Sequence, residues 1–507
     1  MPKHIVVNAI DRRYGARIEV IMQKFKNLSR KKKIRYSIIS VLLFYLVYVI
    51  ISATIPFVNP PEVSDEFKHS LNLNDFYSDT TSVDRAAVVE TNQDALDVRI
   101  HMINQAKEKI AISSFSIKHD RSCKEIASVI LDAANRGVKV QILVDGLTGN
   151  IDMASDPIYY ALGTHENVEI RYYNMLNLLK PWTANGRLHD KYLIIDDSLL
   201  LLGGRNISNY FLGEYNTNVL SYDRDILVYN TAANTSKNKE SVLSQVWSYF
   251  ETVWDDKMSK PVFDRIPRYK KDMVTKACEA LGLIYQDLKT SQPQLFTEVD
   301  YVPITVPTNK ISLITNPIHI MAKEPLIWYQ MAELMKNANK RVYIQSPYAV
   351  LDSTMYKDMK DISNKVPDFR MLINSTAGGD NVMASSDYTF NKSKVIKTGV
   401  QIFEFQGEHS MHDKSVLIDD DISIIGSFNV DMRSTYLDTE VMLVVHGTEF
   451  NKQLESYMYA MQDKSLPVHE DGSYGTNGNV IPLEISTGKK ILYNVTSVVF
   501  QLFRYLL

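Results

Sequence analysis

The sequence predicts an α/β protein in which two α/β sandwich domains are fused behind a single N-terminal transmembrane helix. Three observations lead to this prediction. A motif of polar residues occurs twice at the same spacing, each copy follows an alternation of strand and helix patterns, and a long apolar stretch without charges lies near the N-terminus. A chain of 507 residues also exceeds what one hydrophobic core usually serves, so two domains are expected.

The apolar stretch covers residues 38–58 and follows a basic segment, residues 1–37. As a helix its 21 residues would span roughly 30 Å, the thickness of bilayer hydrocarbon. Basic residues precede it (Arg30, Lys31, Lys32, Lys33 and Arg35), and acidic residues follow it. The positive-inside rule predicts a single-pass protein of the cell membrane, with a cytoplasmic N-terminus and extracytoplasmic domains. A cleaved signal peptide is the alternative, but its apolar core would be shorter, about 7–15 residues.

After this stretch the chain divides into a linker and a first domain. Residues 59–85 begin with Asn59-Pro60-Pro61, which breaks the helix, and are predicted to be a linker. The first domain is predicted over residues 86–256. It starts with a strand, an amphipathic helix and a second strand, at residues 110–117, 123–136 and 138–144. This β-α-β order is typical of an α/β sandwich.

The second domain, predicted over residues 310–470, repeats the plan of the first. Its strand, helix and strand are expected at residues 341–345, 355–364 and 369–374, and helices at 241–252 and 448–461 are expected to close the two halves. Residues 257–309 are interpreted as a connector that packs over the cleft. Residues 471–507 form a tail whose last stretch, Lys489–Leu507, is helical and apolar. It is expected to dock on the protein, with an interfacial membrane helix as the alternative.

The repeated motif reads H-x-K, four residues, D, six residues, G-[GS]-x-N. The first copy consists of His189-Asp190-Lys191, Asp196 and Gly203-Gly204-Arg205-Asn206, and the second, 223 positions later, of His412-Asp413-Lys414, Asp419 and Gly426-Ser427-Phe428-Asn429. A single H-x-K is usually without function, but duplication in register indicates a site.

The chemistry of this motif can be read from its spacing. A strand that begins His-x-Lys carries both side chains on one face. The apolar runs that follow each H-x-K predict two-stranded hairpins, each ending at small residues and an asparagine. Two histidines, two lysines and two asparagines that converge would suit a phosphodiester without a metal. One imidazole can attack phosphorus while the other protonates the leaving oxygen, which predicts a phosphohistidine intermediate.

The duplicated motif resembles the signature of the phospholipase D superfamily. Further segments resemble bacterial cardiolipin synthases, particularly the C-type branch: residues 203–207, Ser346-Pro347-Tyr348, residues 372–375 and residues 426–434. The resemblance covers roughly residues 86–446. It implies the two-histidine mechanism, with His189, by resemblance, as the nucleophile and His412 as the acid.

The resemblance also implies roles for individual residues. The catalytic set is His189, Lys191, His412 and Lys414, and the phosphate-binding pair is Asn206 and Asn429. In the superfamily an acidic residue downstream of each motif orients a histidine, and Asp225 and Glu440 are the matching residues. They lie 19 and 11 residues after the preceding asparagine. Asp196 and Asp419 are expected to hold strands and loops together. Tyr348 is expected to shape the substrate channel.

Composition narrows the functional classes. The net charge of −3 and the absence of a basic stripe argue against a nucleic-acid partner. Two distant cysteines, Cys123 and Cys278, signal neither a zinc site nor a disulfide framework, and no cofactor is expected. The leading hypothesis is a membrane-anchored phosphatidyltransferase that makes cardiolipin from phosphatidylglycerol and a second phospholipid. Hydrolysis to phosphatidic acid is the alternative, a nuclease comes third, and an inactive scaffold is disfavoured. The oligomeric state is not determined by the sequence.

Overall fold

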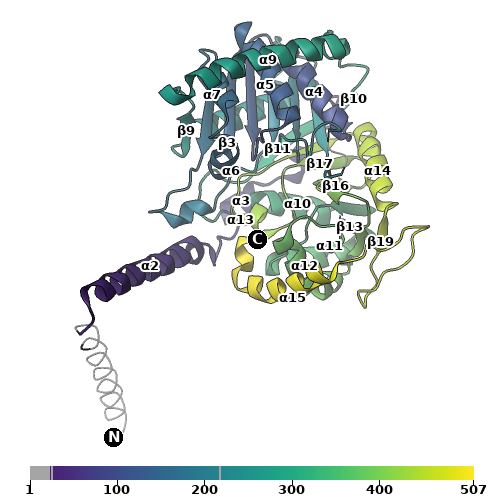
Figure 1. The fold of residues 1–507 in the computed structure, drawn as a ribbon. Helices are drawn as coiled ribbons and strands as arrows, with labels where there is room; N and C mark the ends of the chain where they lie inside the picture. The colour runs from purple at the N-terminus through teal and green to yellow at the C-terminus, as the bar shows by residue number, and fades with distance from the viewer. Residues whose placement is uncertain (1–22, 24–26, 216–217) are drawn as a thin grey trace. The chain divides into compact units, whose positions relative to one another are not determined.

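The computed structural model describes residues 23, 27–215 and 218–507 (Figure 1). Contacts between residues divide the chain into an N-terminal unit that ends at Ile55 and a body that extends from Pro56 to Leu507. The body contains both halves of the duplication. Most of the basic segment, residues 1–22 and 24–26, lies outside the described residues.

The N-terminal unit contains helix α2, Arg30–Thr54, none of whose side chains is buried. Among the described residues, one segment is long and apolar enough to cross a membrane, and it consists of α2 and the turn after it, Arg30–Phe57. The helix begins at Arg30 rather than at residue 38, because lysine and arginine are good helix formers and prolong it into the basic segment. The direction in which α2 would cross a membrane stays a prediction.

A nine-stranded mixed sheet forms the first half of the body. Its strands follow one another in the order β10-β1-β8-β6-β5-β2-β3-β4-β9. The neighbours β2, β3 and β4 are parallel, as the β-α-β prediction requires. The strands are β1 (Asp84–Val89), β2 (Lys109–Ser114), β3 (Lys139–Asp145), β4 (Val168–Tyr173), β5 (Tyr192–Ile195), β6 (Leu199–Gly203), β8 (Asp225–Asn230), β9 (Ser259–Val262) and β10 (Val306–Pro307).

An eight-stranded sheet forms the second half, in the order β11-β18-β17-β16-β12-β13-β14-β19. The run β6-β5-β2-β3-β4 of the first sheet corresponds to β17-β16-β12-β13-β14 here, so the duplication extends to whole domains. The strands are β11 (Lys310–Thr315), β12 (Arg341–Gln345), β13 (Asp368–Asn374), β14 (Gln401–Phe405), β16 (Ser415–Ile418), β17 (Ile422–Gly426), β18 (Val441–His446) and β19 (Ser465–Pro467). The predicted fold class, two fused α/β domains, is confirmed.

Helices cover the outer faces of both sheets (Figure 1). On the first half they pack through apolar residues of α4, α5 and α7, and on the second half through α10, α11 and α12. Their bounds are α4 (Asn92–Gln105), α5 (Arg121–Asn135), α7 (Pro157–Gly163), α10 (Leu326–Lys336), α11 (Ser353–Lys365) and α12 (Val382–Ile396). The shorter helices are α3 (Asp65–Ser70), α6 (Gly146–Asp152) and α13 (Met432–Tyr436).

Two helices lie between the sheets instead of closing the ends of the halves. Apolar side chains of α8 (Val242–Trp254) and α14 (Thr448–Gln462) share one buried cluster with the inner faces of both sheets. Val246 and Phe250 of α8 and Leu454 of α14 are fully buried there. The two halves are therefore joined by a common hydrophobic core, which fixes the position of one motif relative to the other.

The connector does not cover the cleft. Residues 259–262 and 306–307 add the edge strands β9 and β10 to the first sheet. Between them α9, Lys271–Ser291, packs against α5 and α7 on the outer face of the first half. Its buried apolar residues, Val274, Ala277 and Leu281, belong to the core of the first half. Cys278 on this helix and Cys123 are both free thiols.

The C-terminal tail docks on the second half. Helix α15, Thr487–Val499, lies beside α12, and the 3-10 helix η7, Phe500–Leu506, follows it towards α13 (Figure 1). The linker also has structure: Val63 and Phe76 are buried, and α3 starts at a Ser64 cap. Phe57, near the end of the predicted transmembrane stretch, is buried in the body as well.

Candidate active site

Each motif is held at the start of a hairpin. His189 and Lys191 directly precede β5, which pairs with β6, and His412 and Lys414 directly precede β16, which pairs with β17. The strands of both hairpins coincide with the predicted apolar runs. Such continuous apolar runs are typical of strands that are buried on both faces of a sheet.

Asp196 and Asp419 close the turns of these hairpins. Each lies at a positive φ, 50° and 49°. The Asp196 carboxylate accepts hydrogen bonds from the backbone amides of residues 107–109, and the Asp419 carboxylate accepts from those of residues 339–341. In both cases these three amides precede or begin the neighbouring strand. The structure thus places both aspartates at the ends of strands, far along the hairpin from the histidines.

The two motifs are brought together by short backbone pairings between the halves. Leu188 pairs with Thr439 of the other half, and the backbone amide of His189 donates to the Thr439 hydroxyl. In the same way Ser410 and Met411 (β15) pair with Ser221 and Tyr222 (β7) as a two-stranded sheet across the halves. Each histidine therefore enters the site beside a segment of the opposite half.

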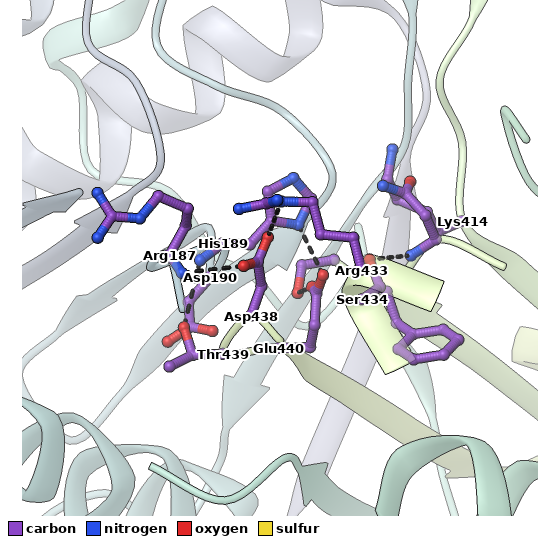
Figure 2. Close-up of polar contacts among 12 residues, drawn as sticks. Arg187, His189, Asp190, Lys414, Arg433, Ser434, Asp438, Thr439 and Glu440 are labelled. Carbon is purple, nitrogen blue, oxygen red and sulfur yellow. Dashed lines mark hydrogen bonds and ion pairs between the residues drawn. The ribbon is translucent and has the colours of Figure 1, made fainter. Parts of the chain in front are cut away.

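Each histidine also meets a carboxylate from the opposite half. The Nδ1 atom of His189 lies 2.8 Å from Oε1 of Glu440, and Nδ1 of His412 lies 2.6 Å from Oδ2 of Asp223. Figure 2 shows the first of these pairs, with Arg433 and Asp438 beside it. Because Nδ1 is occupied, Nε2 is the nitrogen left to react on both imidazoles.

Asp225 does not orient a histidine. Its carboxylate lies 3.0 Å from Arg99 and 3.3 Å from Arg205, so it forms a buried ion pair within the first half. The residue that meets His412 is Asp223, two positions earlier. Counting from the preceding asparagine misses it, because the loop after Asn206 is longer than the loop after Asn429. Counting back from the following strand would have found it: Gly203 pairs with Asp225 and Gly426 with Met442, so Asp223 corresponds to Glu440.

The small residues of the G-[GS]-x-N segment make room for these carboxylates. A Cβ on Gly204 would collide with the Asp223 carboxylate. In the second copy Ser427 occupies the corresponding position, and its hydroxyl donates to Oε2 of Glu440. The sequence suggested that backbone approaches a ligand here, whereas the close approach is to the groups that hold the histidines.

The two lysines are buried next to their histidines. The ammonium of Lys191 donates to the backbone carbonyl of His189 at 2.5 Å, and Lys414 donates to the carbonyl of His412. Burial, together with the charge of Lys414, lowers the pKa of Lys191 to about 7. Burial also lowers the pKa of Lys414. An ammonium has three donors, so each lysine keeps further protons for an anion.

The His189 pair is close to neutral in charge. Burial, with the positive charge of Lys191 as the next cause, lowers the pKa of His189 well below its ordinary value. Burial also raises the pKa of its partner Glu440 to about 8, although Lys191 opposes this. Around neutral pH His189 is therefore a neutral imidazole whose one proton, on Nδ1, faces Glu440, and burial disfavours the ionised form of that carboxyl.

The His412 pair carries a fixed negative charge. Burial and Lys414 lower the pKa of His412, while Asp223 opposes this shift. Burial by itself would raise the pKa of Asp223, but the positive charges of Lys414 and His412 outweigh it and hold this pKa at about 2. An ionised carboxylate thus faces His412, whereas burial disfavours the ionised form of the carboxyl that faces His189.

A cavity of about 370 Å³ joins the two half-sites. Both histidines and both predicted asparagines line it, and the Oδ1 atoms of Asn206 and Asn429 are buried without a hydrogen-bond partner. Tyr348 also lines the cavity. The other lining residues are Phe115, Asn381, Met383, Ala384, Asp431, Arg433, Ser434, Asp438, Leu506 and Leu507. Among the described residues, no group of three histidine, cysteine or acidic side chains is placed to hold a metal ion.

Comparisons with known proteins agree with this geometry. The family model described as "Cardiolipin synthase, PLD-like domain" matches residues 99–254 and 331–462, more than half of the chain. An uncharacterized protein of Helicobacter pylori (strain ATCC 700392 / 26695) is 28% identical over 423 residues, which cover 76% of this chain and 81% of that protein. Cardiolipin synthase C of Escherichia coli (strain K12) is 24% identical over 396 residues, covering 71% and 80%.

A solved structure has the same fold. The crystal structure of phosphatidylserine synthase from Haemophilus influenzae Rd KW20 matches with a TM-score of 0.60 at 14% identity. The match covers 87% of this chain and 100% of that one. The duplicated architecture, the crossed histidines and the family match coincide on the same residues.

Proposed function

Because the chain belongs to the phospholipase D superfamily and resembles the cardiolipin synthases, we propose that it makes cardiolipin from phosphatidylglycerol and a second phospholipid. It is a phospholipid-synthase-like enzyme of that superfamily. The observation that carries the proposal is the pair of histidines. Each is hydrogen-bonded through Nδ1 to a carboxylate of the opposite half, and both line one cavity.

His189 is the nucleophile in this proposal. Its low pKa leaves Nε2 unprotonated and able to attack phosphorus. A bond forms between Nε2 and phosphorus, and the bond to the head-group oxygen breaks. His412 gives its Nε2 proton to that oxygen, which leaves as an alcohol. The negative charge of the bound phosphodiester favours the protonated form of His412 during this step, as Asp223 does.

The second step reverses the roles of the groups. His412, now neutral, takes the proton of an acceptor hydroxyl, here that of phosphatidylglycerol. The acceptor oxygen attacks phosphorus and the bond to His189 breaks, so cardiolipin forms and both histidines return to their first state. If water takes the place of the acceptor, the product is phosphatidic acid.

The phosphate is bound by the lysines and asparagines in this proposal. Lys191 and Lys414 each retain donors beyond the one used on a histidine carbonyl. Asn206 and Asn429 line the cavity from equivalent positions of the two halves, so their amides can donate to the two non-bridging oxygens. The support for a lipid rather than a nucleic acid is the apolar side of the cavity, with Met383, Leu506 and Leu507.

The test is product analysis with the full-length protein in phosphatidylglycerol vesicles, in the presence of a chelator. Cardiolipin and glycerol are expected, measured by mass spectrometry. A second series adds a phospholipid with a different head group as donor. Phosphatidic acid alone would replace the transferase by a hydrolase. No lipid product in either series, together with cleavage of an oligonucleotide, would overturn the assignment in favour of a nuclease.

The intermediate can be trapped on the same protein. Acid-sensitive phosphatidyl-histidine from a rapid denaturing quench is expected on the peptide that contains His189. Its appearance on the His412 peptide instead would reverse the two roles.

We also propose that α2 spans the cell membrane with the N-terminus in the cytoplasm, because the basic residues precede it. Protease added outside intact spheroplasts is expected to degrade the body. Protection of the body until lysis would reverse the orientation.

A further inference from the structure

The C-terminal segment α15–η7 has its polar side inward and its apolar side outward. A helix on the surface of a soluble protein normally buries its apolar stripe and exposes its polar face. Here Tyr493 and Ser497 are buried and Lys489, Thr496 and Arg504 are half-buried, whereas most of the exposed positions carry apolar side chains. The segment therefore reverses the usual pattern: it contacts the body mainly through polar side chains and exposes apolar ones.

Polar contacts hold the inner face of this segment. Arg504 forms an ion pair with Asp387 of α12 at 2.7 Å, and Asp387 is fully buried. Gln501 donates to the same carboxylate, and Lys489 donates to the backbone carbonyls of Ala377 and Gly379. Buried charge-assisted bonds of this kind fix the orientation of the segment, so its apolar face is held outward.

The outer face carries an apolar stripe that runs from Ile491 to Leu502. Its residues recur at positions i, i+1, i+4, i+7, i+8 and i+11, which form one stripe on a helix. They are Ile491, Leu492, Val495, Val498, Val499 and Leu502. The exposed fraction is 60% for Val495 and 72% for Leu502. Residues 485–507 contain no carboxylate side chain, and Lys490 is exposed at the start of the helix.

This stripe is continuous in sequence with residues that line the catalytic cavity. Leu506, the last residue of η7, and Leu507 after it line that cavity and pack in a small apolar cluster with Phe57 and Trp182. Phe57 is where the chain enters the body after the apolar segment that could cross a membrane. The cluster thus joins the residue at which the chain enters the body to the wall of the cavity.

A loop of the first half reaches the same cluster. Trp182 lies at the end of residues 175–182, and this loop exposes Leu178 and Leu179 by 69% and 77%. Both halves of the body therefore present apolar side chains next to the cluster.

We propose that the α15–η7 stripe and the leucines of the 175–182 loop form a surface that inserts into the bilayer interface. This bilayer-docking surface sets the cavity against the membrane that supplies the phospholipid. A bilayer is favoured over a second copy of the chain because the segment that carries the stripe ends, at Leu506 and Leu507, in the cluster of Phe57, and Phe57 directly follows the apolar helix in the chain. The exposed lysine and the lack of carboxylates also fit anionic lipid head groups. The lipid nature of the substrate rests on the proposed function, whereas insertion of the surface does not.

The first experiment measures insertion directly in the full-length protein. Leu502→Cys and Leu283→Cys are made in a Cys278→Ser background, since Cys123 is buried, and labelled with an environment-sensitive fluorophore. Leu283 is the matched control, because it is equally exposed at 72% but lies on α9 of the outer face. In proteoliposomes with doxyl-labelled phospholipid, quenching is expected at position 502 and not at 283.

Each outcome of this experiment decides the proposal. Equal emission and equal quenching at both positions would overturn it. A blue shift at position 502 without doxyl quenching would also overturn it and assign the stripe to another protein molecule. Quenching at 502 in a protein that makes no lipid product would support the surface while the proposed function fails.

The second experiment measures the effect on turnover. Leu502→Glu removes one apolar contact and adds a charge, so turnover on vesicles should fall by about tenfold or more. With a short-chain phosphatidylglycerol below its critical micelle concentration the loss should be clearly smaller. Leu283→Glu should leave both rates unchanged. Equal losses of the Leu502→Glu variant on the two substrates, or none on vesicles, would contradict the proposal.

Discussion

The two halves of the site contain the same motif but support it in different ways. The register of the sheets makes Asp223 equivalent to Glu440 and Asp225 equivalent to Met442. Within the motif, Arg205 corresponds to Phe428. The first half therefore has a buried Arg205–Asp225 ion pair where the second half has two apolar side chains.

This difference separates two kinds of constraint. The crossed contacts between histidine and carboxylate occur in both halves, so the chemistry needs them whatever surrounds them. The side chains next to the asparagine loop are the ion pair Arg205–Asp225 in the first half and the apolar Phe428 and Met442 in the second. These side chains therefore need only to fill space and fix the loop. The electrostatic asymmetry of the histidine pairs fits a division of labour between nucleophile and acid.

The largest effect is expected when one of the two histidines is removed at a time. His189→Ala and His412→Ala should each reduce kcat by at least about 10²- to 10⁴-fold, because neither imidazole can be both nucleophile and proton donor. The measurement is the initial rate of lipid product formation, with the melting temperature as a control for folding. Substantial activity in either single variant would refute the two-histidine mechanism.

The double variant sharpens this prediction. Groups that act as one unit are strongly non-additive, so His189→Ala with His412→Ala should be little slower than either single variant. If the two losses multiply, the histidines act independently and do not share one reaction coordinate.

The next effect concerns the ion pair that only the first half contains. Asp225→Met should lower the free energy of unfolding by about 3–5 kcal/mol, since it leaves the buried Arg205 and Arg99 without their carboxylate. Arg205→Met should cost less, because Arg99 still pairs with Asp225. The double variant copies the apolar arrangement of the second half and should be more stable than Asp225→Met alone, since only Arg99 then lacks its partner. Thermal unfolding in detergent measures it. Losses that simply add would mean that the pair is not an isolated unit, and Arg99 beside Asp225 would then be the residue to change next.

The fold could be predicted from the sequence because its signals are local. Buried apolar runs define the strands: β12 has the bounds that were expected, residues 341–345. The positions of α8 and α14 between the sheets could not be predicted, because an amphipathic pattern says that a helix buries one face but not against which sheet. The same limit explains α9, whose apolar face packs on α5 rather than over the cleft.

The candidate site was predictable where residues are neighbours in the sequence and not where they meet across the halves, although each H-x-K precedes its strand instead of starting it. The H-x-K spacing fixes His189 and Lys191 on one face of the chain. Asp223 was not predicted, because the loop that precedes it differs in length from its counterpart and because its partner His412 lies in the other half. Leu506 and Leu507 at the cavity carry no signal at all in the sequence, since their position depends on how α15 docks.

The two carboxylates should differ in their effect on the pH profile. Asp223 is ionised and raises the pKa of His412, so Asp223→Asn should lower that pKa by about 1–3 units. The limb of kcat/KM that reports loss of the His412 proton on raising the pH would move to lower pH, and activity at neutral pH would fall.

Glu440→Gln is the matched comparison for this shift. Burial raises the pKa of Glu440 to about 8, so its negative charge contributes less at neutral pH than that of Asp223, and a glutamine can still accept a hydrogen bond from Nδ1 of His189. Its profile should move little below pH 7. If both variants shift the limb equally, both carboxylates are ionised in the free enzyme, and the proposed electrical difference between the half-sites is wrong.

The smallest effect is expected where the two halves are most alike. Asp196 and Asp419 each accept hydrogen bonds from backbone amides at a strand start while holding a positive φ. Asp196→Ala and Asp419→Ala should each cost about 1–3 kcal/mol of stability and leave the activity of the folded protein intact. Asparagine at either position tolerates the same φ and should cost less. Because the two turns make equivalent contacts, unequal losses of stability would show that one hairpin depends more strongly on its aspartate. A loss of activity in stable protein would instead move the aspartate concerned into the site.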